Sequence, residues 1–469
     1  MLKIKYCICV WLICCATLWS CKKSQDFNYK ELNELEIKDS VNLTIVQFDT
    51  LKINPQITQS KPEGEGFTYQ WKIYPYSPIE GLDAQVLATT KALNAVIPYP
   101  PLKDGYNLEY KITNSATGVS TFKIYSIRVT DAFGEGWLVS STASGNAQLG
   151  FIRSDYKVFY NPAGAVNQTT FPGNAVGAYV FYNSDESRFG VSFFTDKGSY
   201  RFNATDFLRS GKSTTSFTPV KDKFAFGVSR FTTEEYLVND GSLYAASMLN
   251  DPASVTYSER LEGDYNLFPK VITNGLFSTY FYDNKYKRFM YVPFGSFSLI
   301  PTFGSAKAAF NIGDTGMLMV GAMDGASADE FFFIMQDSNG DRFIYSLSGA
   351  QPQVNEKIMN SPAIASAKTF AASKFLRQVY YATDNSIYLY DIVLKSSQLL
   401  YTFPSGTQIK QIQINPADNR SMVVSANQAS GGGVYFFKIN TLGEFSNGTY
   451  AQKVDGFGEI SVVSYRKGN

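Results

Sequence analysis

The sequence contains no histidine among its 469 residues. Histidine is the side chain that most often acts as a general base or as a zinc ligand near neutral pH. Its absence excludes Ser-His-Asp and Cys-His catalysis and every metal site that uses imidazole. Any catalysis by this chain would therefore have to proceed without imidazole.

Cysteine is absent after position 21. The five cysteines are Cys7, Cys9, Cys14, Cys15 and Cys21, in a segment that is basic at Lys3 and Lys5 and apolar from Tyr6 to Trp19. This pattern is typical of a secretory signal and is too short for a comfortable membrane span. The run ends in Leu18-Trp19-Ser20-Cys21, which resembles a bacterial lipobox. We predict a lipoprotein signal peptide over 1–20 and lipidation of Cys21; the alternative is an ordinary signal peptide with incidental cysteines.

Cleavage before Cys21 would leave the mature chain one sulfur, and that sulfur would carry lipid. Disulfides, thiolate catalysis and cysteine-ligated metals are then excluded, and no metal or cofactor is expected. No later segment approaches 18 uninterrupted apolar residues. We therefore expect attachment to a membrane through an acyl anchor rather than through a membrane span.

Excess charge of either sign is also missing. The chain has 42 Lys and Arg against 41 Asp and Glu. A nucleic-acid binder needs a basic surface to neutralise phosphates, so no nucleic-acid partner is expected. With 44% hydrophobic residues the bulk of the chain should be globular, and its length suggests roughly two to four domains.

The part of the chain after the anchor begins with a polar segment. Residues 21–36 carry the lipidated cysteine and a tether, and residues 37–131 are predicted to form a β-sandwich. The expected strands are Val41–Gln47, Thr50–Asn54, Phe67–Tyr74, Ala95–Tyr99, Tyr106–Thr113 and Thr121–Thr130. Period-two alternation puts Phe67, Tyr69 and Trp71 on one face. We interpret Trp71 as a core residue; the alternative is a tryptophan that stacks on a ligand.

Residues 132–469 repeat a hairpin whose turn contains Gly or Asn, residues that tolerate the positive φ of tight turns. The turns are Ser144–Asn146, Asp196–Gly198, Asn239–Gly241, Pro293–Gly295, Ser338–Gly340, Asp384–Ser386 and Ser430–Gly432. Six steps cover 287 residues, about 48 each. The aromatic residues expected to pack sheet against sheet are Tyr200, Tyr244, Phe297, Phe343, Tyr388 and Tyr435.

A period of this length with about four strands per unit is typical of a β-propeller. Seven turns predict seven blades; six or eight blades, or an irregular array of β-sandwiches, are the alternatives. The final segment, Glu459–Arg466, has no room for partners after it. We expect it to complete the first blade beside Trp137–Ser141, so that no sheet edge stays free. The predicted fold class is all-β, a β-sandwich followed by a seven-bladed β-propeller.

Motifs with possible chemistry are few, and no catalytic residue is predicted. The segment Asp337–Asp341 resembles the start of a calcium loop but has Ser348 at the twelfth position, so we interpret it as a turn. The acidic pairs Glu234-Glu235 and Asp185-Glu186 could serve a glycosidase, but we interpret them as exposed charges at strand starts. The segment Ser430–Gly433 lacks the Lys-Ser/Thr of a phosphate loop.

One aromatic and cationic stretch is a candidate ligand-binding surface. It contributes Tyr280, Tyr282, Tyr286 and Arg288, with Phe294 a few residues on. Such side chains could hold an anionic or ring-bearing ligand. The alternative is that the tyrosines pack between blades and the charges form a hairpin tip.

Taken together, the lipobox cysteine, the polar tether, the segment Phe67-Thr-Tyr-Gln-Trp71 and the aromatic β-repeat resemble the PKD-like lipoproteins of Bacteroidetes. The tryptophan strand continues as Lys72-Ile-Tyr-Pro75, where PKD strands usually continue as Asp-Phe-Gly-Asp. The resemblance implies an Ig/PKD-like sandwich and a surface-exposed accessory subunit of a SusC/SusD-like, TonB-dependent outer-membrane importer. It identifies no ligand-binding residue.

We therefore expect a non-enzymatic lipoprotein, anchored in the outer membrane and facing the cell exterior. Its partners would be a SusC/SusD-like transporter and an extracellular nutrient, whether peptide, glycan or siderophore, bound on the propeller. Two alternatives stay open. The propeller could dock on the transporter as a scaffold without binding cargo, or the protein could be a hydrolase that uses carboxylates alone.

Overall fold

The computed structural model describes residues 33–61, 66–181, 190–217, 220–221, 223–229, 234–248, 254–273, 278–305 and 307–468. The chain divides into two compact units, Met1–Thr130 and Asp131–Asn469. The predicted signal peptide and Cys21 lie outside the described residues. Within those residues, no helix is both long and apolar enough to cross a membrane.

In its described part the first unit contains three β-sheets. A five-stranded sheet has the order β2-β9-β8-β5-β6, and two-stranded sheets pair β1 with β4 and β3 with β7. The strands are β1 (Leu35–Ile37), β2 (Asn42–Val46), β3 (Thr50–Ile53), β4 (Ile57–Gln59), β5 (Phe67–Pro75), β6 (Gln85–Ala88), β7 (Leu93–Val96), β8 (Tyr106–Asn114) and β9 (Ser120–Thr130).

Trp71 lies in the core of this unit. Its side chain is 0% exposed, its ring stacks on Tyr110 with 4.0 Å between centroids, and its Nε1–H donates to the carbonyl of Thr90 at 3.0 Å. A buried indole needs such a partner for its polar atom. The interpretation of Trp71 as a core residue is confirmed, because a side chain with no exposed surface cannot stack on a ligand.

The six expected strands of this unit are all present, within a few residues of the predicted ends. Three short strands, β1, β4 and β6, were not expected. β1 begins at Leu35, inside the segment expected to be a tether, and pairs with β4 in the register Leu35↔Gln59. Leu35–Ile37 is too short for its alternation to be recognised without its partner.

The second unit contains seven sheets of three to five strands in its described part, together with a two-stranded pairing of β18 and β22. The first sheet is β12-β11-β10-β39, with β13 beside β11. The strands of the first half are β10 (Gly136–Ala143), β11 (Asn146–Arg153), β12 (Val158–Phe159), β13 (Phe171–Pro172), β14 (Ala175–Phe181), β15 (Gly190–Thr195), β16 (Gly198–Asn203), β17 (Arg209–Gly211), β18 (Ser213–Thr214), β19 (Phe224–Val228), β20 (Glu234–Asn239), β21 (Ser242–Ser247) and β22 (Val255–Thr256).

The remaining sheets each have four antiparallel strands in sequence order. Their strands are β23 (Ile272–Thr273), β24 (Thr279–Asp283), β25 (Arg288–Val292), β26 (Ile300–Pro301), β27 (Leu318–Asp324), β28 (Glu330–Gln336), β29 (Arg342–Ser348), β30 (Gln351–Lys357), β31 (Thr369–Ala372), β32 (Gln378–Ala382), β33 (Ser386–Asp391), β34 (Ser396–Thr402), β35 (Gln408–Ile414), β36 (Ser421–Gln428), β37 (Gly431–Lys438) and β38 (Gln452–Phe457). In the described part of the chain the helical elements are short: α2 (Pro162–Asn167), η1 (Ile364–Ser366) and η2 (Ser446–Gly448).

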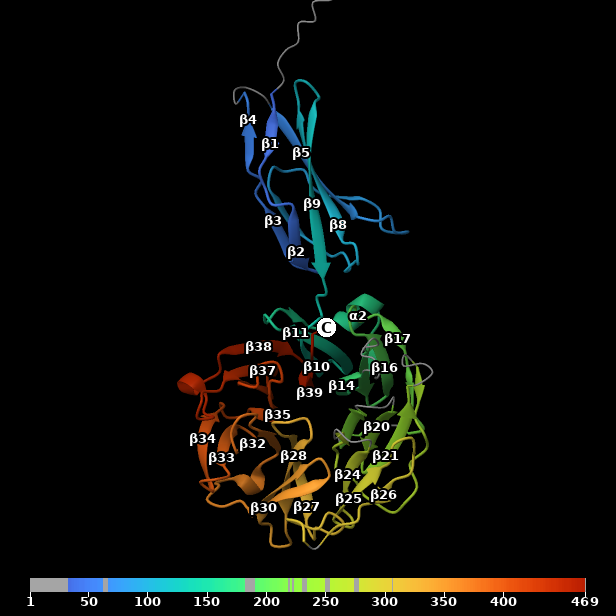
Figure 1. Ribbon diagram of the computed structural model, residues 1–469, viewed down its shortest axis with the longest axis vertical. Helices are drawn as coiled ribbons and strands as arrows, with labels where there is room; N and C mark the ends of the chain where they lie inside the picture. Colours follow the sequence, from blue (N-terminus) through green and yellow to red (C-terminus); the bar gives the residue numbers. More distant parts are fainter. Residues whose placement is uncertain are drawn as a thin grey trace, which may run out of the picture. The chain divides into compact units, whose positions relative to one another are not determined.

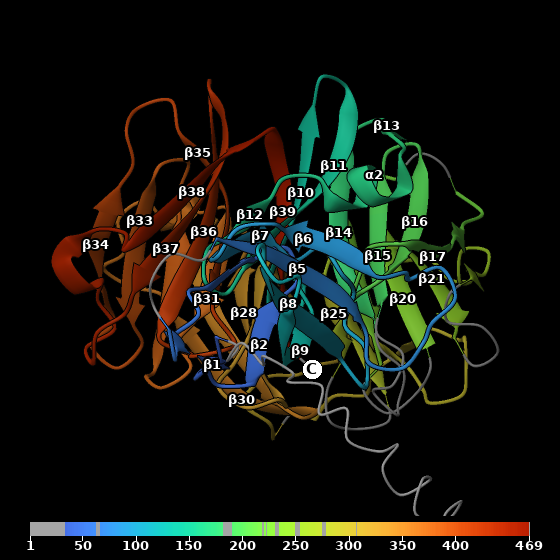
Figure 2. The same cartoon turned by 90° about the horizontal axis from the view of Figure 1, so that it is seen from above.

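One end strand of each sheet faces a common centre, and we call β39, β14, β19, β23, β27, β31 and β35 the inner strands. Neighbouring inner strands contact each other from β27 through β31, β35, β39, β14 and β19 to β23. Figure 1 shows the sheets of this unit following one another around that centre in sequence order, and Figure 2 shows their strands after a 90° turn. Apolar side chains fill the space between adjacent sheets, as in the cluster that joins Tyr380 to Phe437. The architecture is all-β and propeller-like.

The last strand of the chain completes the first sheet. β39 (Glu459–Arg466) pairs antiparallel with β10 in the register Trp137↔Tyr465, which is the pairing expected from the sequence. The Tyr465 hydroxyl also donates to Glu135 Oε1 at 2.6 Å. The two ends of the second unit are thereby joined in one ladder, and the edge of β10 is covered.

A β-bulge recurs in the inner strands. Each bulge places an extra residue near the start of the strand: Val176 in β14, Val320 in β27, Lys410 in β35 and Ser461 in β39. A bulge bends a strand and turns the following side chains. β39 comes last in the sequence, yet it carries the same irregularity as the inner strands β14, β27 and β35. It is therefore structurally equivalent to them.

One of the repeat turns is misplaced in the sequence prediction. Six of the seven turns join the second and third strands of their sheets, but Pro293–Gly295 follows β25 and lies at its other end. The equivalent turn joins β24 to β25 after Asp283. Accordingly Phe297, expected to pack between sheets, is 42% exposed, whereas Phe289 is fully buried in that role. Pro-Phe-Gly has ordinary turn chemistry, so composition did not distinguish the two turns.

Candidate functional site

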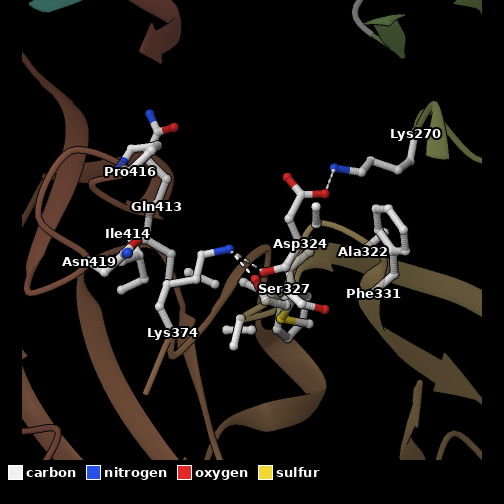
Figure 3. Close-up of a pocket in the computed structure, with 18 of the residues that line it drawn as sticks. Lys270, Ala322, Asp324, Ser327, Phe331, Lys374, Gln413, Ile414, Pro416 and Asn419 are labelled. Atoms are coloured by element: carbon white, nitrogen blue, oxygen red, sulfur yellow. Dashed lines mark hydrogen bonds and ion pairs between the residues drawn. The ribbon is translucent and has the colours of Figure 1, made fainter. Parts of the chain in front are cut away.

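A pocket of about 460 Å³ lies where three inner strands end (Figure 3). Its walls come from β27, β31 and β35 and from the loops that follow them, with Lys270 and Thr273 contributed by the preceding sheet. Antiparallel sheets place successive turns at opposite ends. The pocket is therefore at the end of these sheets opposite to the repeat turns.

Two lysines and one aspartate supply the charges of the pocket. Lys270 Nζ lies 2.9 Å from Asp324 Oδ1, and the side chain of Lys270 is 26% exposed. Lys374, in the loop after β31, reaches across to the neighbouring sheet and donates to the carbonyls of Asp324 and Gly325 at 2.9 and 2.5 Å. Figure 3 shows the ammonium groups of Lys270 and Lys374 approaching Asp324 from opposite sides.

The environment of Lys374 lowers its pKa. Burial is the main cause, because it disfavours the charged form. Asp324 and Glu330 raise the pKa, while the positive charge of Lys270 lowers it. Among the described residues, no ion pair joins Lys374 to a carboxylate, so its bonds go to uncharged carbonyl oxygens.

The polar wall of the pocket also holds the sheets together. Gln413 Nε2 donates to the carbonyl of Val463 at 2.9 Å, and Gln411 Oε1 accepts from the N–H of Val463 at 3.0 Å. Both glutamines follow the bulge at Lys410 in β35. These bonds fix the two amides and leave Gln413 Oε1 and Gln411 Nε2 with capacity for a further hydrogen bond.

The remaining surface combines small, apolar and aromatic groups. Phe331 and Phe370 are 4% and 8% exposed. Their rings are therefore packed in the wall of the pocket and have little surface on which a ligand could stack. Ser327 and Asn419 lie at the exposed rim. Of the described residues that line the pocket, Asp324 is the one carboxylate. The arrangement is suited to binding a polar ligand with a negative group, and it does not present two facing carboxylates for glycoside hydrolysis.

The five residues predicted to bind ligand do not form one surface. Tyr282 is 1% exposed, and its hydroxyl donates to the carbonyl of Met317 at 2.6 Å. Tyr280 is half-buried and stacks on Tyr291 with 5.8 Å between centroids. Tyr282 therefore has almost no surface to offer a ligand, whereas Tyr280 keeps part of its surface exposed.

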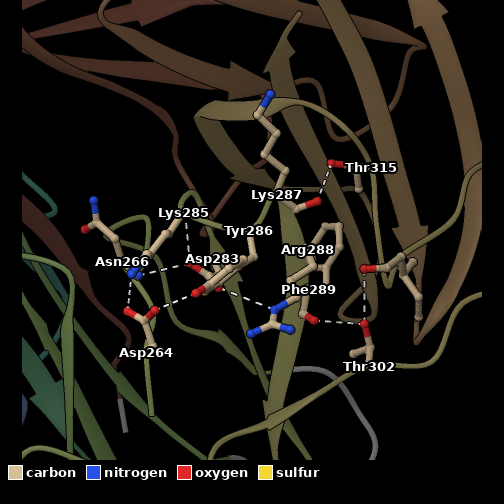
Figure 4. A network of polar contacts seen from close by, with 11 residues as sticks. Asp264, Asn266, Asp283, Lys285, Tyr286, Lys287, Arg288, Phe289, Thr302 and Thr315 are labelled. Carbon is tan, nitrogen blue, oxygen red and sulfur yellow. Dashed lines mark hydrogen bonds and ion pairs between the residues drawn. The ribbon is translucent and has the colours of Figure 1, made fainter.

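Tyr286 and Arg288 do lie together at the β24–β25 turn (Figure 4). The Arg288 guanidinium lies 4.7 Å from the ring centroid of Tyr286. The Tyr286 hydroxyl donates to Asp264 Oδ2 at 2.5 Å, and Lys285 forms an ion pair with the same carboxylate. These two bonds lower the pKa of Asp264. Phe294 is 59% exposed but follows β25 at the end opposite to Arg288. Ligand binding by these residues stays a prediction.

The acidic pair Glu234-Glu235 is buried, so its interpretation as a pair of exposed charges was wrong. Glu235 is 0% exposed and pairs with Arg201, which is equally buried. The Tyr257 hydroxyl donates to Glu235 Oε2 at 2.6 Å. The partners lie on β16, on β20 and beyond β22, and a sequence does not show that these elements meet. The pair Asp185-Glu186 lies outside the described residues.

The segment Asp337–Asp341 is a turn, as expected. Asp337 Oδ1 accepts from the N–H groups of Asn339 and Asp341, both at 2.9 Å. These bonds use the carboxylate to shape the loop. The described part of the chain contains no group of three or more acidic side chains placed to hold a metal ion.

Residues 26–173 match the sequence model of the PKD-like family. The match covers the described part of the first unit and continues into β13 of the second unit. A search of curated proteins finds no match to this sequence. The N-terminal domain is therefore PKD-like.

Solved structures with similar folds come from several organisms. A quinonprotein alcohol dehydrogenase-like protein from Bacteroides thetaiotaomicron is 14% identical with a TM-score of 0.48, covering 93% of this chain and 100% of its own. A proposed 6-phosphogluconolactonase from Bacteroides fragilis is 10% identical with a TM-score of 0.50, covering 71% and 98%. A Swd1 β-propeller domain from Myceliophteria thermophila is 10% identical with a TM-score of 0.37, covering 60% and 87%. Likeness at such low identity concerns the fold and not the activity.

Proposed function

We propose that this protein is a non-enzymatic binding protein that holds an extracellular nutrient in the pocket between Lys270, Asp324 and Lys374. The observation that carries the proposal is the pocket itself. Its volume of about 460 Å³ is within the range of small-molecule sites. Its polar groups converge from four sheets, and its single carboxylate favours recognition over acid–base hydrolysis.

The second unit is, in this proposal, a seven-bladed β-propeller. Seven sheets in sequence order and the pairing of β39 with β10 support this number. The bulge shared by β14, β27, β35 and β39 supports the assignment of β39 as an inner strand. Ligand sites are common where the loops of such a scaffold converge.

The cellular setting in the proposal is the outer-membrane surface. The lipobox-like sequence that ends at Cys21 supports an acyl anchor, and the PKD-like match supports the resemblance to lipoproteins associated with SusC/SusD-like transporters. The protein would capture a peptide, glycan or siderophore as an accessory subunit of the importer. Radiolabelled palmitate should enter the wild-type chain and not the C21S variant, and absence of label in the wild type would contradict the anchor.

The binding role is tested by filling the pocket. Ser327 is exposed and lines the pocket, whereas Ser338 is exposed in the turn at the other end of the same sheet. S327W should therefore abolish binding that S338W leaves intact. The measurement is calorimetric titration of the protein, anchor residue replaced, with fractionated peptide and glycan digests.

Three outcomes separate the candidate functions. Saturable binding without turnover, lost in S327W and kept in S338W, supports the binding role. Release of products from a digest would show a hydrolase instead. Co-purification with the transporter by both variants, with no ligand bound by either, would show a scaffold.

A further inference from the structure

Lys374 is a half-buried ammonium that no described carboxylate pairs with. It lies in the loop between β31 and β32, and it spends two of its three N–H groups on the carbonyls of Asp324 and Gly325. Carbonyl oxygens satisfy these donors but do not neutralise the charge. Because this half-buried charge has only carbonyl oxygens as hydrogen-bond acceptors, an anion entering the pocket would be stabilised beside it.

The nearby carboxylates are already engaged. Asp324 is paired with Lys270. Glu330 Oε2 accepts from the N–H of Ala326 at 2.8 Å, which turns this carboxylate toward its own loop. The lining residues therefore carry two positive charges against one negative charge.

The pocket also offers groups for the uncharged part of a ligand. Gln413 and Gln411 present fixed amides, and Ser327 lies at the rim. Fixed donors and acceptors reduce the entropic cost of binding. The side chains that line the pocket are thus complementary to a ligand with one negative group and several hydrogen-bonding groups.

We propose that the pocket recognises a carboxylate group of its ligand, which lies against the Lys374 ammonium and within reach of Lys270. This inference rests on the proposed binding function and adds the chemical class of the ligand. A carboxylate can accept the third N–H of Lys374 as a charge-assisted bond. The carboxylate could belong to a uronic acid residue or to the C-terminus of a short peptide.

The test compares charged probes with neutral probes of the same shape. Trigalacturonate is titrated beside its methyl ester, and acetyl-triglycine beside its amide, at low and moderate salt. We expect at least one carboxylate probe to bind and its neutral counterpart to bind about ten- to a hundredfold more weakly, the range of one hydrogen bond to a charged group. The saccharide and peptide arms then distinguish the two sources of the carboxylate.

The variants K374M and K374R assign the effect to one side chain. K374M should lower the affinity for the carboxylate probe about ten- to a hundredfold. K374R should retain most of that affinity because it keeps the positive charge. Lys368 pairs with Asp384 on the exposed surface at the other end of β31, so K368M removes the same net charge outside the pocket. K368M should leave the affinity within about twofold.

The outcomes separate this inference from the binding function. Equal affinity for charged and neutral probes, abolished by S327W, would overturn the carboxylate assignment and support the binding function. The preference for the carboxylate probe over its neutral counterpart should fall in K374M and not in K368M. If K368M lowers this preference as much as K374M does, the role of Lys374 is overturned. Failure of all four probes would overturn the inference, while the digest experiment with S327W would still decide the binding function.

Discussion

The side-chain amide of Asn427 brackets the main chain of Ile460: Nδ2 donates to the Ile460 carbonyl, and Oδ1 accepts the Ile460 N–H, both at 2.9 Å. Asn427 is on β36 and Ile460 is on β39, so the two bonds tie the last strand of the chain to the preceding sheet. The ladder with β10 holds the other side of the same strand. β39 is thereby fixed between two sheets.

The substitution N427A should lower the free energy of unfolding by about 1–3 kcal/mol, because it leaves two buried main-chain groups without this amide. Urea denaturation checks the value. Asn355 is exposed, and N355A should change stability by less than about 0.5 kcal/mol. An N427A protein as stable as N355A would show that the bracket contributes nothing.

The substitution E235Q should destabilise the protein by about 3–5 kcal/mol, because it removes the negative charge that faces the fully buried Arg201. The comparison is D384N, which breaks the exposed pair with Lys368 and should cost less than about 1 kcal/mol. Denaturation curves of the two variants at neutral pH measure the difference. Similar losses in both would mean that burial does not amplify the interaction.

The substitution G321A should both destabilise the second unit and disturb the pocket. A Cβ at Gly321 would lie 2.4 Å from Cδ2 of Phe370, a pocket residue, so the ring must move. Overpacking of this kind costs about 1–3 kcal/mol. At Gly198 a Cβ meets nothing within 4 Å and φ is not positive, so G198A should be nearly neutral. Thermal melts measure the loss of stability, and titration with the carboxylate probe measures the change in the pocket. If G321A and G198A have the same stability and the same affinity, a Cβ at position 321 does not displace Phe370.

The ion pair of Asp155 should make stability depend on pH in the acid range. Arg153 donates to both carboxylate oxygens, at 2.8 and 2.6 Å, and lowers the pKa of Asp155 below its usual 3.8. The native state therefore favours the ionised form, and this contribution is present above pH 3.8 and lost as pH falls through the native pKa. Because Asp155 is 57% exposed, the contribution should stay below about 1 kcal/mol. Wild type should exceed D155N in stability at pH 6 and match it near pH 2; an unchanging difference would exclude the linkage.

The candidate site was harder to predict than the fold, and particular residues show why. Lys270, Asp324 and Lys374 are separated by 54 and 50 positions in the sequence, and each is unremarkable beside its neighbours. They meet because successive sheets bring corresponding strand ends to the same place. The predicted stretch from Tyr280 to Phe294 stood out by composition, but Tyr282 is buried and Phe294 lies at the other end of its strand.

The sequence by itself determined the all-β class, the burial of Trp71 and the pairing of the last strand with the first sheet of the repeat. These follow from alternation and turn residues, which are local and repeat along the chain. Only the tertiary structure decided that the fourth turn of the repeat joins β24 to β25 and is not Pro293–Gly295. It also decided that Glu235 is buried against Arg201 and that Lys270 and Lys374 line the same pocket. Those features depend on contacts between sheets, and a contact between distant strands leaves no periodic pattern in either of them.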